Sequence, residues 1–228
     1  MHYVTNFRDR LGDIHQNIDI GKFTTRHFPI QKELDKSDVM IVCGDAGLIW
    51  DGSNEDKYWQ KWLNEKSFTT FCCLGNHENY NLINEYPIIE IFSGKARQIQ
   101  SSVFYAISGE IYVINNKSFL FINGADSQDK EWRTEGKSWW PQEQITSTDI
   151  SHAFYNLEKY DFNVDYIISH TGGSEICKML GFSPTVSDKW LDKVLDVAQY
   201  EKHYLGHYHL NNWVGKSRII YNDIIELY

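Results

Sequence analysis

Apolar segments that each end in a short polar turn are the feature that most constrains the fold of this chain. Segment 68–73 is short and rich in aromatic and β-branched residues, and Gly75-Asn76-His77-Glu78 follows it closely. Such a segment is typical of a buried strand, and a glycine behind it permits a sharp turn. We therefore expect an amide, an imidazole and a carboxylate at the carboxyl end of a strand, where open α/β sheets place their sites. A polar turn with no chemical role is the competing interpretation.

Four other predicted strand ends carry side chains of the same kinds. Segment 38–43 leads into Gly44-Asp45, and segment 164–169 leads into His170. The outer residues of 13–15 and of 207–209 are two positions apart, so both side chains of each pair lie on one side of an extended backbone. Two ligands placed in this way can hold one ion. The candidates are Asp13, His15, Asp45, Asn76, His77, His170, His207 and His209.

The candidate donors are carboxylate, imidazole and amide groups, without a thiolate. Such donors suit Mn²⁺, Fe or Zn²⁺ rather than a cysteine-rich structural zinc site. Without His77, the set still holds more ligands than one ion with an open position needs, and it suits two ions that share a carboxylate. Any single histidine here can equally be interpreted as a core or surface residue. Five of the nine histidines, however, fall in polar turns behind apolar segments, which disfavours coincidence.

Strands alternate with predicted helices in the first half of the chain, and hairpins enter in the second half. We expect Ser53, Thr148 and Ser187 to be the N-caps of three helices. Segment 99–114 alternates polar and apolar residues, which predicts a hairpin or meander. This order predicts α/β layers with mixed rather than purely parallel sheets. The length is that of one domain, which we expect to span residues 1–228.

Charge and hydropathy limit the partners that this chain can have. The formal net charge of -9 disfavours a surface for duplex nucleic acid. No stretch approaches the roughly 18 apolar residues of a membrane span, and the first residues lack the pattern of a signal peptide. The four cysteines lie in or beside apolar segments without paired zinc spacing, so we interpret them as reduced core thiols. Together these observations predict a cytoplasmic protein without a membrane partner.

In the order of its motifs, the chain resembles the calcineurin-like metallophosphoesterases over nearly its whole length. The motifs are Asp13-x-His15, Gly44-Asp45, Gly75-Asn76-His77-Glu78, His170 and Gly206-His207-x-His209. The resemblance implies an α/β fold, a four-layer αββα sandwich with two mixed β-sheets, and a dinuclear metal site. It also implies that one ion is held by Asp13, His15 and His209 and the other by Asn76, His170 and His207, with Asp45 as the bridge.

Two features depart from the family pattern. The family usually runs its first strand straight into the Asp-x-His turn, whereas residues 6–11 intervene here and bear on the placement of Asp13 and His15. The protein Ser/Thr phosphatases usually follow Gly-Asp with Asp-Arg-Gly and place an arginine before Gly-Asn-His-Glu. This chain has Ala46-Gly47-Leu48 and Leu74 at those places, which disfavours that branch. The Gly-Asp-x-Gly form, the tryptophan pair and the short C-terminus resemble a small bacterial or phage-type branch.

The resemblance also suggests a mechanism. Two divalent ions about 3.5–4 Å apart, Mn²⁺ in the first place and Fe or Zn²⁺ as alternatives, would lower the pKa of a bridging water and orient the hydroxide for in-line attack on phosphorus. Both ions would neutralise charge on the phosphoryl oxygens. His77 would point towards the leaving-group oxygen as general acid or charge stabiliser. Glu78 is either a partner that orients a ligand or a solvated turn residue.

The polar and aromatic segment 127–144 is a long loop, and loops of this length are either functional or poorly ordered. Its part from Ser127 to Trp140 is the candidate for substrate selection. The planar fork of Arg133 suits a phosphate, and a surface salt bridge is its alternative role. Trp139 and Trp140 either stack on a nucleobase or leaving group of the substrate or pack beneath the loop.

These observations predict a metal-dependent phosphoesterase that acts on a small phosphorylated substrate, either a monoester or a diester, with His77 as the catalytic residue. A nuclease is the nearest alternative, which the acidic charge balance weakens. The alternatives from other classes are a metal-binding regulator without turnover and a catalytically silent binding or scaffold module on the same fold. Such modules typically lose site residues, and here every expected ligand has a candidate. The substrate, the physiological metals and the oligomeric state do not follow from the sequence.

Overall fold

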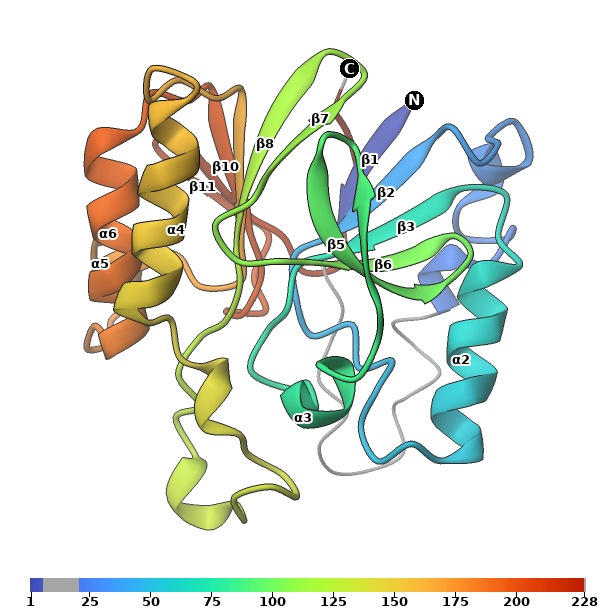
Figure 1. Cartoon of the computed structure of the whole chain (residues 1–228), viewed down its shortest axis with the longest axis horizontal. Coiled ribbons are helices and arrows are strands. Elements are labelled where there is room, and N and C mark those ends of the chain that lie inside the picture. Colours follow the sequence, from blue (N-terminus) through green and yellow to red (C-terminus); the bar gives the residue numbers. More distant parts are fainter. Residues whose placement is uncertain (6–20, 228) are drawn as a thin grey trace.

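The computed structural model describes residues 1–5 and 21–227 of the chain. Two β-sheets lie face to face, and helices cover the outer face of each (Figure 1). This order of layers confirms the predicted αββα sandwich with two mixed sheets. The outer layers are α2 (Asn54–Asn64) on the first sheet and α4 (Ser147–Glu158), α5 (Gly173–Met179) and α6 (Val186–Val197) on the second.

The first sheet has the strand order β13-β1-β2-β3-β6-β5-β4 within the described residues. The four strands from β1 to β6 in this order run parallel, and the outer pairs are antiparallel. Residues of β2, β3 and β6 are buried throughout, because another layer covers each face of a parallel sheet. The bounds are β1 (His2–Thr5), β2 (Val39–Val42), β3 (Thr69–Cys72), β4 (Ile88–Ile91), β5 (Gly94–Gln100), β6 (Val103–Ala106) and β13 (Ile225–Glu226).

The second sheet has the order β11-β12-β10-β9-β8-β7 in the part of the chain that is described. Its inner strands, from β12 to β8, run parallel, and a hairpin closes each edge. The bounds are β7 (Ile111–Ile114), β8 (Lys117–Ile122), β9 (Tyr166–Ser169), β10 (Lys202–Leu205), β11 (Asn212–Val214) and β12 (Ser217–Ile219).

Apolar side chains fill all three spaces between the four layers. Between the sheets, Phe71 of β3 meets Tyr112 of β7 and Phe121 of β8 with ring centroids 4.7 and 5.3 Å apart, in the edge-to-face arrangement that aromatic rings favour. Leu63 joins α2 to the outer face of the first sheet. Leu191 joins α6 to the outer face of the second sheet. Each sheet is therefore buried on both faces, and its functional groups are found at the strand ends.

Two of the three predicted helix caps lie two residues too far along the chain. Ser53 caps α2 as expected, by accepting a backbone N–H of the first turn. The cap of α4 is Thr146 and not Thr148, and the cap of α6 is Thr185 and not Ser187. Each threonine accepts the N–H of an aspartate three residues on, whose carboxylate accepts the N–H of the threonine. This reciprocal capping box satisfies two backbone donors at once, which explains the earlier helix start.

The prediction of one hairpin or meander over 99–114 is wrong in its pairing. Strand β6 pairs with β5 in the first sheet, whereas β7 pairs with β8 in the second sheet. Residues 107–110 thus carry the chain from one sheet to the other. Alternation of polar and apolar residues does not distinguish these cases, because the strands of both sheets have one face on the shared core.

The loops that follow β2, β3 and β8 leave the sheets on the lower side of Figure 1. The long loop 127–144, with η3 (Lys130–Trp132) and η4 (Pro141–Glu143), lies at the same side. Parallel strands bring their carboxyl ends to one edge, where such folds place their sites. Among the described residues no helix has the length and apolar character needed to cross a membrane. The remaining short helices are η1 (Gly21–Phe23), η2 (Pro29–Lys32) and α3 (Tyr80–Ile83).

Candidate functional site

A cleft of about 340 Å³ opens at the carboxyl edge of the two sheets. Predicted site residues from several strand ends and from the loop 127–144 line it together. His170 lies behind them, fully buried, in contact with Asp45 and Asn76. Asp13 and His15 are outside the described residues. The predicted residues on the cleft wall are Asp45, Asn76, His77, Arg133, His207 and His209.

Two glycines allow the strand-end turns to approach one another closely. A Cβ atom at Gly75 would lie 2.0 Å from the Asp45 carboxylate oxygen Oδ1. A Cβ atom at Gly44 would lie 2.2 Å from the His170 ring nitrogen Nδ1, and Gly44 has a φ of +97°. Real Cβ contacts are never this short, so any side chain at either position would displace a candidate ligand. These glycines are therefore needed for space at the site as well as for the turn.

The carboxylate of Asp45 joins the turns behind three strands. Its Oδ1 accepts the backbone N–H of His77 at 3.0 Å, and its Oδ2 lies 3.2 Å from His170 Nε2. Burial by itself would raise the pKa of Asp45, but the imidazoles of His170, His77 and His207 outweigh it and hold that pKa below its ordinary value. Asp45 is thus an anionic oxygen donor at the centre of the site.

His170 is oriented as a metal ligand is oriented. Its Nδ1 lies 2.8 Å from the carbonyl oxygen of Cys43, which can only accept, so Nδ1 carries a proton and donates. Its Nε2 then faces two oxygens, Asp45 Oδ2 at 3.2 Å and Asn76 Oδ1 at 3.1 Å. These three atoms need a positive charge among them, which either a second proton on His170 or a divalent ion would supply. A histidine that donates to a backbone carbonyl with one nitrogen and faces an ion with the other is the usual arrangement in metal sites.

The donor set of this corner fits a divalent ion. Ligands bound at about 2.1 Å lie roughly 3 Å from one another, which is the spacing seen around His170 Nε2. Within residues 1–5 and 21–227, no group of three or more His, Cys, Asp and Glu side chains is arranged to hold a metal ion. The corner has two such side chains, Asp45 and His170, and the amide oxygen of Asn76 is its third donor. Asp13 and His15, which the resemblance adds to the same centre, lie outside that part of the chain.

His207 and His209 come from the turn behind β10, on the second sheet. The ring centroid of His207 lies 5.0 Å from that of His170, and His209 stacks on Tyr221 at 5.1 Å. Burial, with the neighbouring His170, lowers the pKa of His207 well below its usual range, so its imidazole is neutral at pH 7 and has a lone pair for an ion. This turn therefore faces the two turns of the first sheet.

Three of the candidate ligands have strained backbone conformations. Asp45, His207 and His209 have φ angles of +52°, +64° and +51°, a region that residues with a side chain rarely adopt. Each such residue costs about 1–3 kcal/mol, and the surrounding structure must compensate. Strain at three candidate ligands of one cleft supports a functional reason for their placement.

Glu78 lies behind the site and holds the turn that follows Asp45. It is fully buried, which excludes the alternative of a solvated turn residue. Its Oε1 accepts the backbone N–H of Gly47 at 3.4 Å, and its Oε2 accepts the hydroxyl of Tyr105 at 2.9 Å. Burial, together with the negative charge of Asp45, raises the pKa of Glu78 to about 8. Glu78 thus ties the turn behind β2 to β6.

Arg133 reaches the cleft from the loop 127–144. Its side chain is largely buried, and its Nε lies 2.7 Å from a carboxylate oxygen of the half-exposed Asp129. Its two terminal nitrogens lie 3.0 and 3.2 Å from the ring nitrogens of His77. Arg133 therefore makes the predicted salt bridge and also faces the site. Trp140 is buried and packs edge-on against Trp50, so packing beneath the loop is its role.

Several residues of the cleft do not follow from sequence motifs. Ser127 accepts the amide N–H of Asn76 at 3.1 Å and thereby orients it. Asp129, Phe182 and Tyr208 line the cleft as well. Tyr208 lies between two predicted ligands, which is a usable signal. Phe182 comes from the loop between α5 and α6, and its sequence neighbours give no sign of a site.

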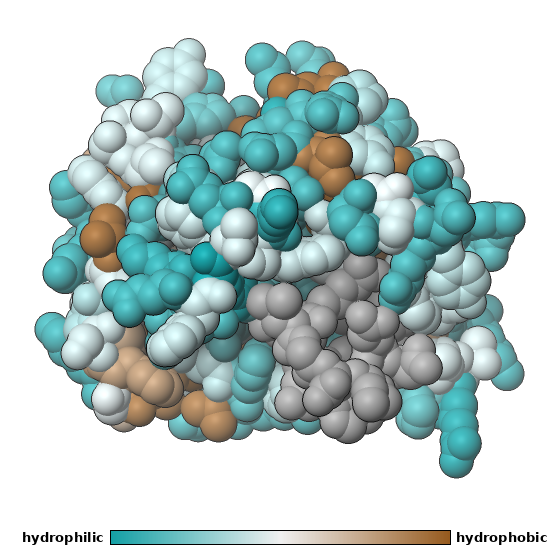
Figure 2. Space-filling view, turned by 90° about the horizontal axis from the view of Figure 1, so that it is seen from below, coloured by the Kyte–Doolittle hydropathy of each residue, from teal (hydrophilic) through white to brown (hydrophobic). Residues whose placement is uncertain are grey.

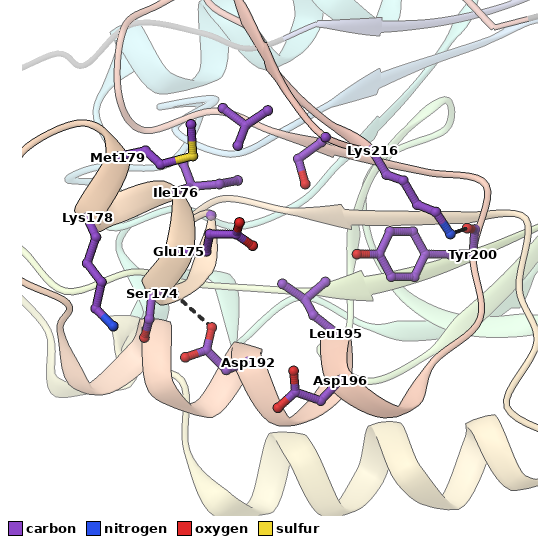
Figure 3. A pocket seen from close by; sticks show the side chains of 14 residues that line it. Ser174, Glu175, Ile176, Lys178, Met179, Asp192, Leu195, Asp196, Tyr200 and Lys216 are labelled. Carbon is purple, nitrogen blue, oxygen red and sulfur yellow. Dashed lines mark hydrogen bonds between the residues drawn. The ribbon is translucent and has the colours of Figure 1, made fainter.

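A larger cavity, of about 580 Å³, lies elsewhere, among α5, α6 and the β11–β12 hairpin (Figure 3). Glu175, Asp192 and Asp196 project into it, and Asp192 accepts the backbone N–H of Ser174 at 2.8 Å. None of the predicted ligands lines this cavity. Size therefore does not identify the site of this protein, whereas the convergence of strand ends does.

The lower face of the molecule, at which the strand ends open, is predominantly hydrophilic, and its apolar residues form separate small patches (Figure 2).

A comparison with family models found one described as calcineurin-like phosphoesterase, which matches residues 11–211. The matched range includes every candidate ligand from Asp13 to His209. A search of curated proteins found no match.

Proposed function

The chain belongs to the calcineurin-like phosphoesterases, a family that hydrolyses phosphoric esters with divalent metal ions, and on this premise we propose the finer details of its reaction. The protein hydrolyses a small phosphate monoester or diester at the cleft. Asp13, His15 and His209 would hold one divalent ion there, and Asn76, His170 and His207 would hold a second. Asp45 would be a ligand to both. Mn²⁺ fits the oxygen and nitrogen donors, and Fe or Zn²⁺ are alternatives.

The arrangement around His170 Nε2 carries this proposal. Carboxylate and amide oxygens at 3.2 and 3.1 Å from this nitrogen are favourable only with a positive charge among the three atoms, and in this proposal a divalent ion supplies that charge in place of a second proton on His170. The ions, when bound, supply an activated water and neutralise charge on the phosphoryl oxygens. The protein supplies the fixed positions, because Cys43 orients His170 and Ser127 orients Asn76.

His77 acts as the general acid in this proposal. Its backbone N–H is fixed on Asp45, while its imidazole lies on the wall of the cleft. The ring therefore has a set position on the cleft wall, from which a proton can pass to the leaving-group oxygen. Proton transfer by a positioned side chain contributes about 10²–10⁴-fold to a rate.

Arg133 binds the phosphoryl group of the substrate. Its planar fork matches two phosphate oxygens, and Asp129 holds the side chain in the cleft. The terminal nitrogens contact His77 in the structure. A phosphoryl group that takes these nitrogens as partners would leave the His77 ring facing the leaving group, so substrate binding and acid catalysis are coupled.

A matched pair of aryl phosphate substrates tests this function. The purified protein is loaded with Mn²⁺ and assayed with an aryl phosphate monoester and with the corresponding diester, and the same sample is assayed after treatment with a chelator. We expect hydrolysis of at least one ester, loss of that activity with the chelator and recovery when Mn²⁺ is added again.

Absence of turnover with both esters, in a protein that holds fewer than two ions, would contradict the proposal. It would support the alternative of a binding or scaffold module on this fold. Hydrolysis that persists in full after metal removal would contradict the role of the ions. It would not contradict the assignment of the protein as an esterase.

A further inference from the structure

Two aromatic rings form one wall of the cleft, and the proposed reaction uses neither of them. Phe182 and Tyr208, here called the aromatic wall, both line the cleft. Their rings are stacked, with centroids 6.3 Å apart and an interplanar angle of 22°. Phe182 nevertheless remains 44% exposed, which is unfavourable for an aromatic side chain in water. A ligand in the cleft would cover this exposed surface.

Phe182 is held in place by the end of a helix. Gly181 adopts a φ of +84° directly behind α5, and the N–H of Phe182 donates to the carbonyl oxygen of Cys177 at 2.9 Å. This is the hydrogen bond of a Schellman motif, which fixes the chain direction after a helix. The exposed ring is therefore presented by a defined backbone geometry and not by a loose loop.

Tyr208 is held from behind. Its hydroxyl accepts the backbone N–H of Gly172 at 3.3 Å and pairs with the hydroxyl of Thr171 at 3.2 Å. Its ring lies between the stacked Phe182 and the imidazole of His207, whose centroid is 5.1 Å away. The aromatic wall thus extends from the surface to a candidate metal ligand.

The rest of the cleft is polar and small. Carboxylate, amide, imidazole and guanidinium groups of Asp45, Asn76, His77 and Arg133 form its other walls. The volume of about 340 Å³ is near the lower limit of pockets that bind small molecules. A small ester fits this shape better than a polymer, with its phosphoryl group on the polar walls and an apolar planar group on the aromatic wall.

We propose that the aromatic wall selects phosphoesters whose leaving group carries a planar aromatic ring, and that Phe182 is a specificity-determining residue. This inference rests on the proposed function, because it assigns the leaving group of that reaction. A ring on the leaving group would stack on Phe182, and aromatic stacking of this kind is tolerant of the identity of the ring. Nucleobases and simple arenes share this chemistry.

Two pairs of substrates test the effect of an aromatic ring while the reacting atoms stay the same. Adenosine 5′-phosphate and ribose 5-phosphate share the same leaving oxygen and differ in the nucleobase. Benzyl phosphate and cyclohexylmethyl phosphate are both esters of primary alcohols and differ in whether the ring is aromatic. We expect kcat/KM to favour the aromatic member of at least one pair by about 10-fold. Preference in the first pair alone indicates a nucleobase, and preference in both indicates any planar ring.

The variants Phe182→Leu and Phe182→Ala test the residue. Leucine keeps apolar bulk without a π-face, so both variants are expected to reduce the preference to within about twofold of unity. Met179→Ala is the matched control, because Met179 is also an exposed apolar residue of the same region but does not line the cleft. This control should keep the wild-type preference.

Binding of adenosine 5′-phosphate and ribose 5-phosphate, measured by calorimetry in the presence of a chelator, gives a second test that needs no turnover. If wild-type protein hydrolyses neither these monoesters nor the aryl phosphate diester, the proposed function is contradicted, and a 10-fold binding preference that Phe182→Leu removes would still support the aromatic wall. Equal kcat/KM and equal binding within each pair, or a preference that survives Phe182→Leu, would overturn the inference.

Discussion

The strand-end turns and the loop 127–144 build the same cleft in different ways. The turns behind β2, β3 and β9 are buried, whereas the turn behind β10 is partly exposed. Polar groups of the buried turns are fixed by backbone partners such as the Cys43 carbonyl and the His77 N–H. The loop places Arg133 through a salt bridge to the half-exposed Asp129. A charge pair near water contributes little to stability, whereas strand ends are held by the whole sheet. We infer that the turns hold the reacting centre and that the loop adjusts substrate binding.

Asp45→Asn is the largest expected loss. It keeps the shape of the side chain and removes the negative charge that is shared among the turns. We expect metal content to fall and kcat/KM to drop by more than about 10³-fold, because loss of one charge-stabilising group already costs about 10²–10³-fold. Elemental analysis and ester hydrolysis measure the two effects. Asp196→Asn, on the surface of α6, is the matched control and should match wild type; wild-type metal content in Asp45→Asn would contradict its role as a ligand.

His77→Ala separates proton transfer from metal binding. The backbone N–H that fixes Asp45 remains, so the variant should keep its ions while kcat falls by about 10²–10⁴-fold. Metal analysis on the assayed sample checks that the centre is intact. His27→Ala serves as a control, since His27 is exposed and does not line the cleft. Normal turnover by metal-loaded His77→Ala would remove His77 from the mechanism.

Gly75→Ala tests the close approach of the turns. Its Cβ would lie 2.0 Å from Asp45 Oδ1, so the carboxylate must move. We expect metal affinity to fall by about 10–100-fold, as for loss of a group that orients a ligand. Gly21→Ala is the matched control, because a Cβ there has no neighbour within 4 Å. Metal titrations of both variants measure this difference in affinity. Equal metal affinities in the two variants would contradict the prediction, because the turns would then tolerate the extra atom.

Arg133→Ala tests the loop. Loss of its charge-assisted contacts should raise KM by about 10-fold or more, with a smaller change in kcat and with metal content unchanged. Arg26→Ala, on the surface, controls for the loss of one positive charge. Steady-state kinetics with the better ester of the aryl pair measure KM and kcat separately. A fall in metal content after Arg133→Ala would contradict the separation between the turns and the loop.

The smallest effect on activity is expected for a substitution of His203, which lies within β10 and not in a strand-end turn. It is buried between the hydroxyls of Ser169 and Ser217, at 2.6 and 3.1 Å, and burial lowers its pKa to about 3. The unfolded chain binds this proton below about pH 6.5, while the folded chain stays neutral until about pH 3. Stability from this group is therefore complete above pH 6.5 and is lost as the pH falls through that window.

Chemical denaturation of wild type and His203→Asn as a function of pH measures this contribution. The wild-type free energy of unfolding, relative to that of the variant, should be about 2 kcal/mol lower at pH 5 than at pH 8. Activity at neutral pH should change little. A difference between the two proteins that does not depend on pH would contradict the assignment of a neutral buried imidazole.

The comparison of the two regions also explains how far the sequence could lead. Asp45, Asn76 and His170 are recognised because an apolar strand and a polar turn are local patterns, and the fold class follows from the order of such patterns. Phe182 meets Tyr208 only in the tertiary structure, from a loop without a distinctive pattern. Arg133 could be named from the sequence, but its contact with His77 depends on how the loop returns to the sheets.

The wrong helix caps and the wrong strand pairing have a physical reason of the same kind. At the start of α4, Thr146 and Thr148 are equally good caps by residue type, and the reciprocal contact with Asp149 decides for the first. In segment 99–114 the polar and apolar alternation is correct, but the pairing partners lie in different sheets. Local pattern gives the elements and their buried faces, and only the packed structure gives the partners.

The number of divalent ions per chain tests the central claim most directly. Wild-type protein is saturated with Mn²⁺, freed of unbound metal and measured for metal and protein in the same sample. We predict two ions per chain, and markedly fewer in Asp45→Asn under the same treatment. One ion or none in wild-type protein, or two ions in both proteins, would contradict a dinuclear centre built from the strand-end turns and bridged by Asp45.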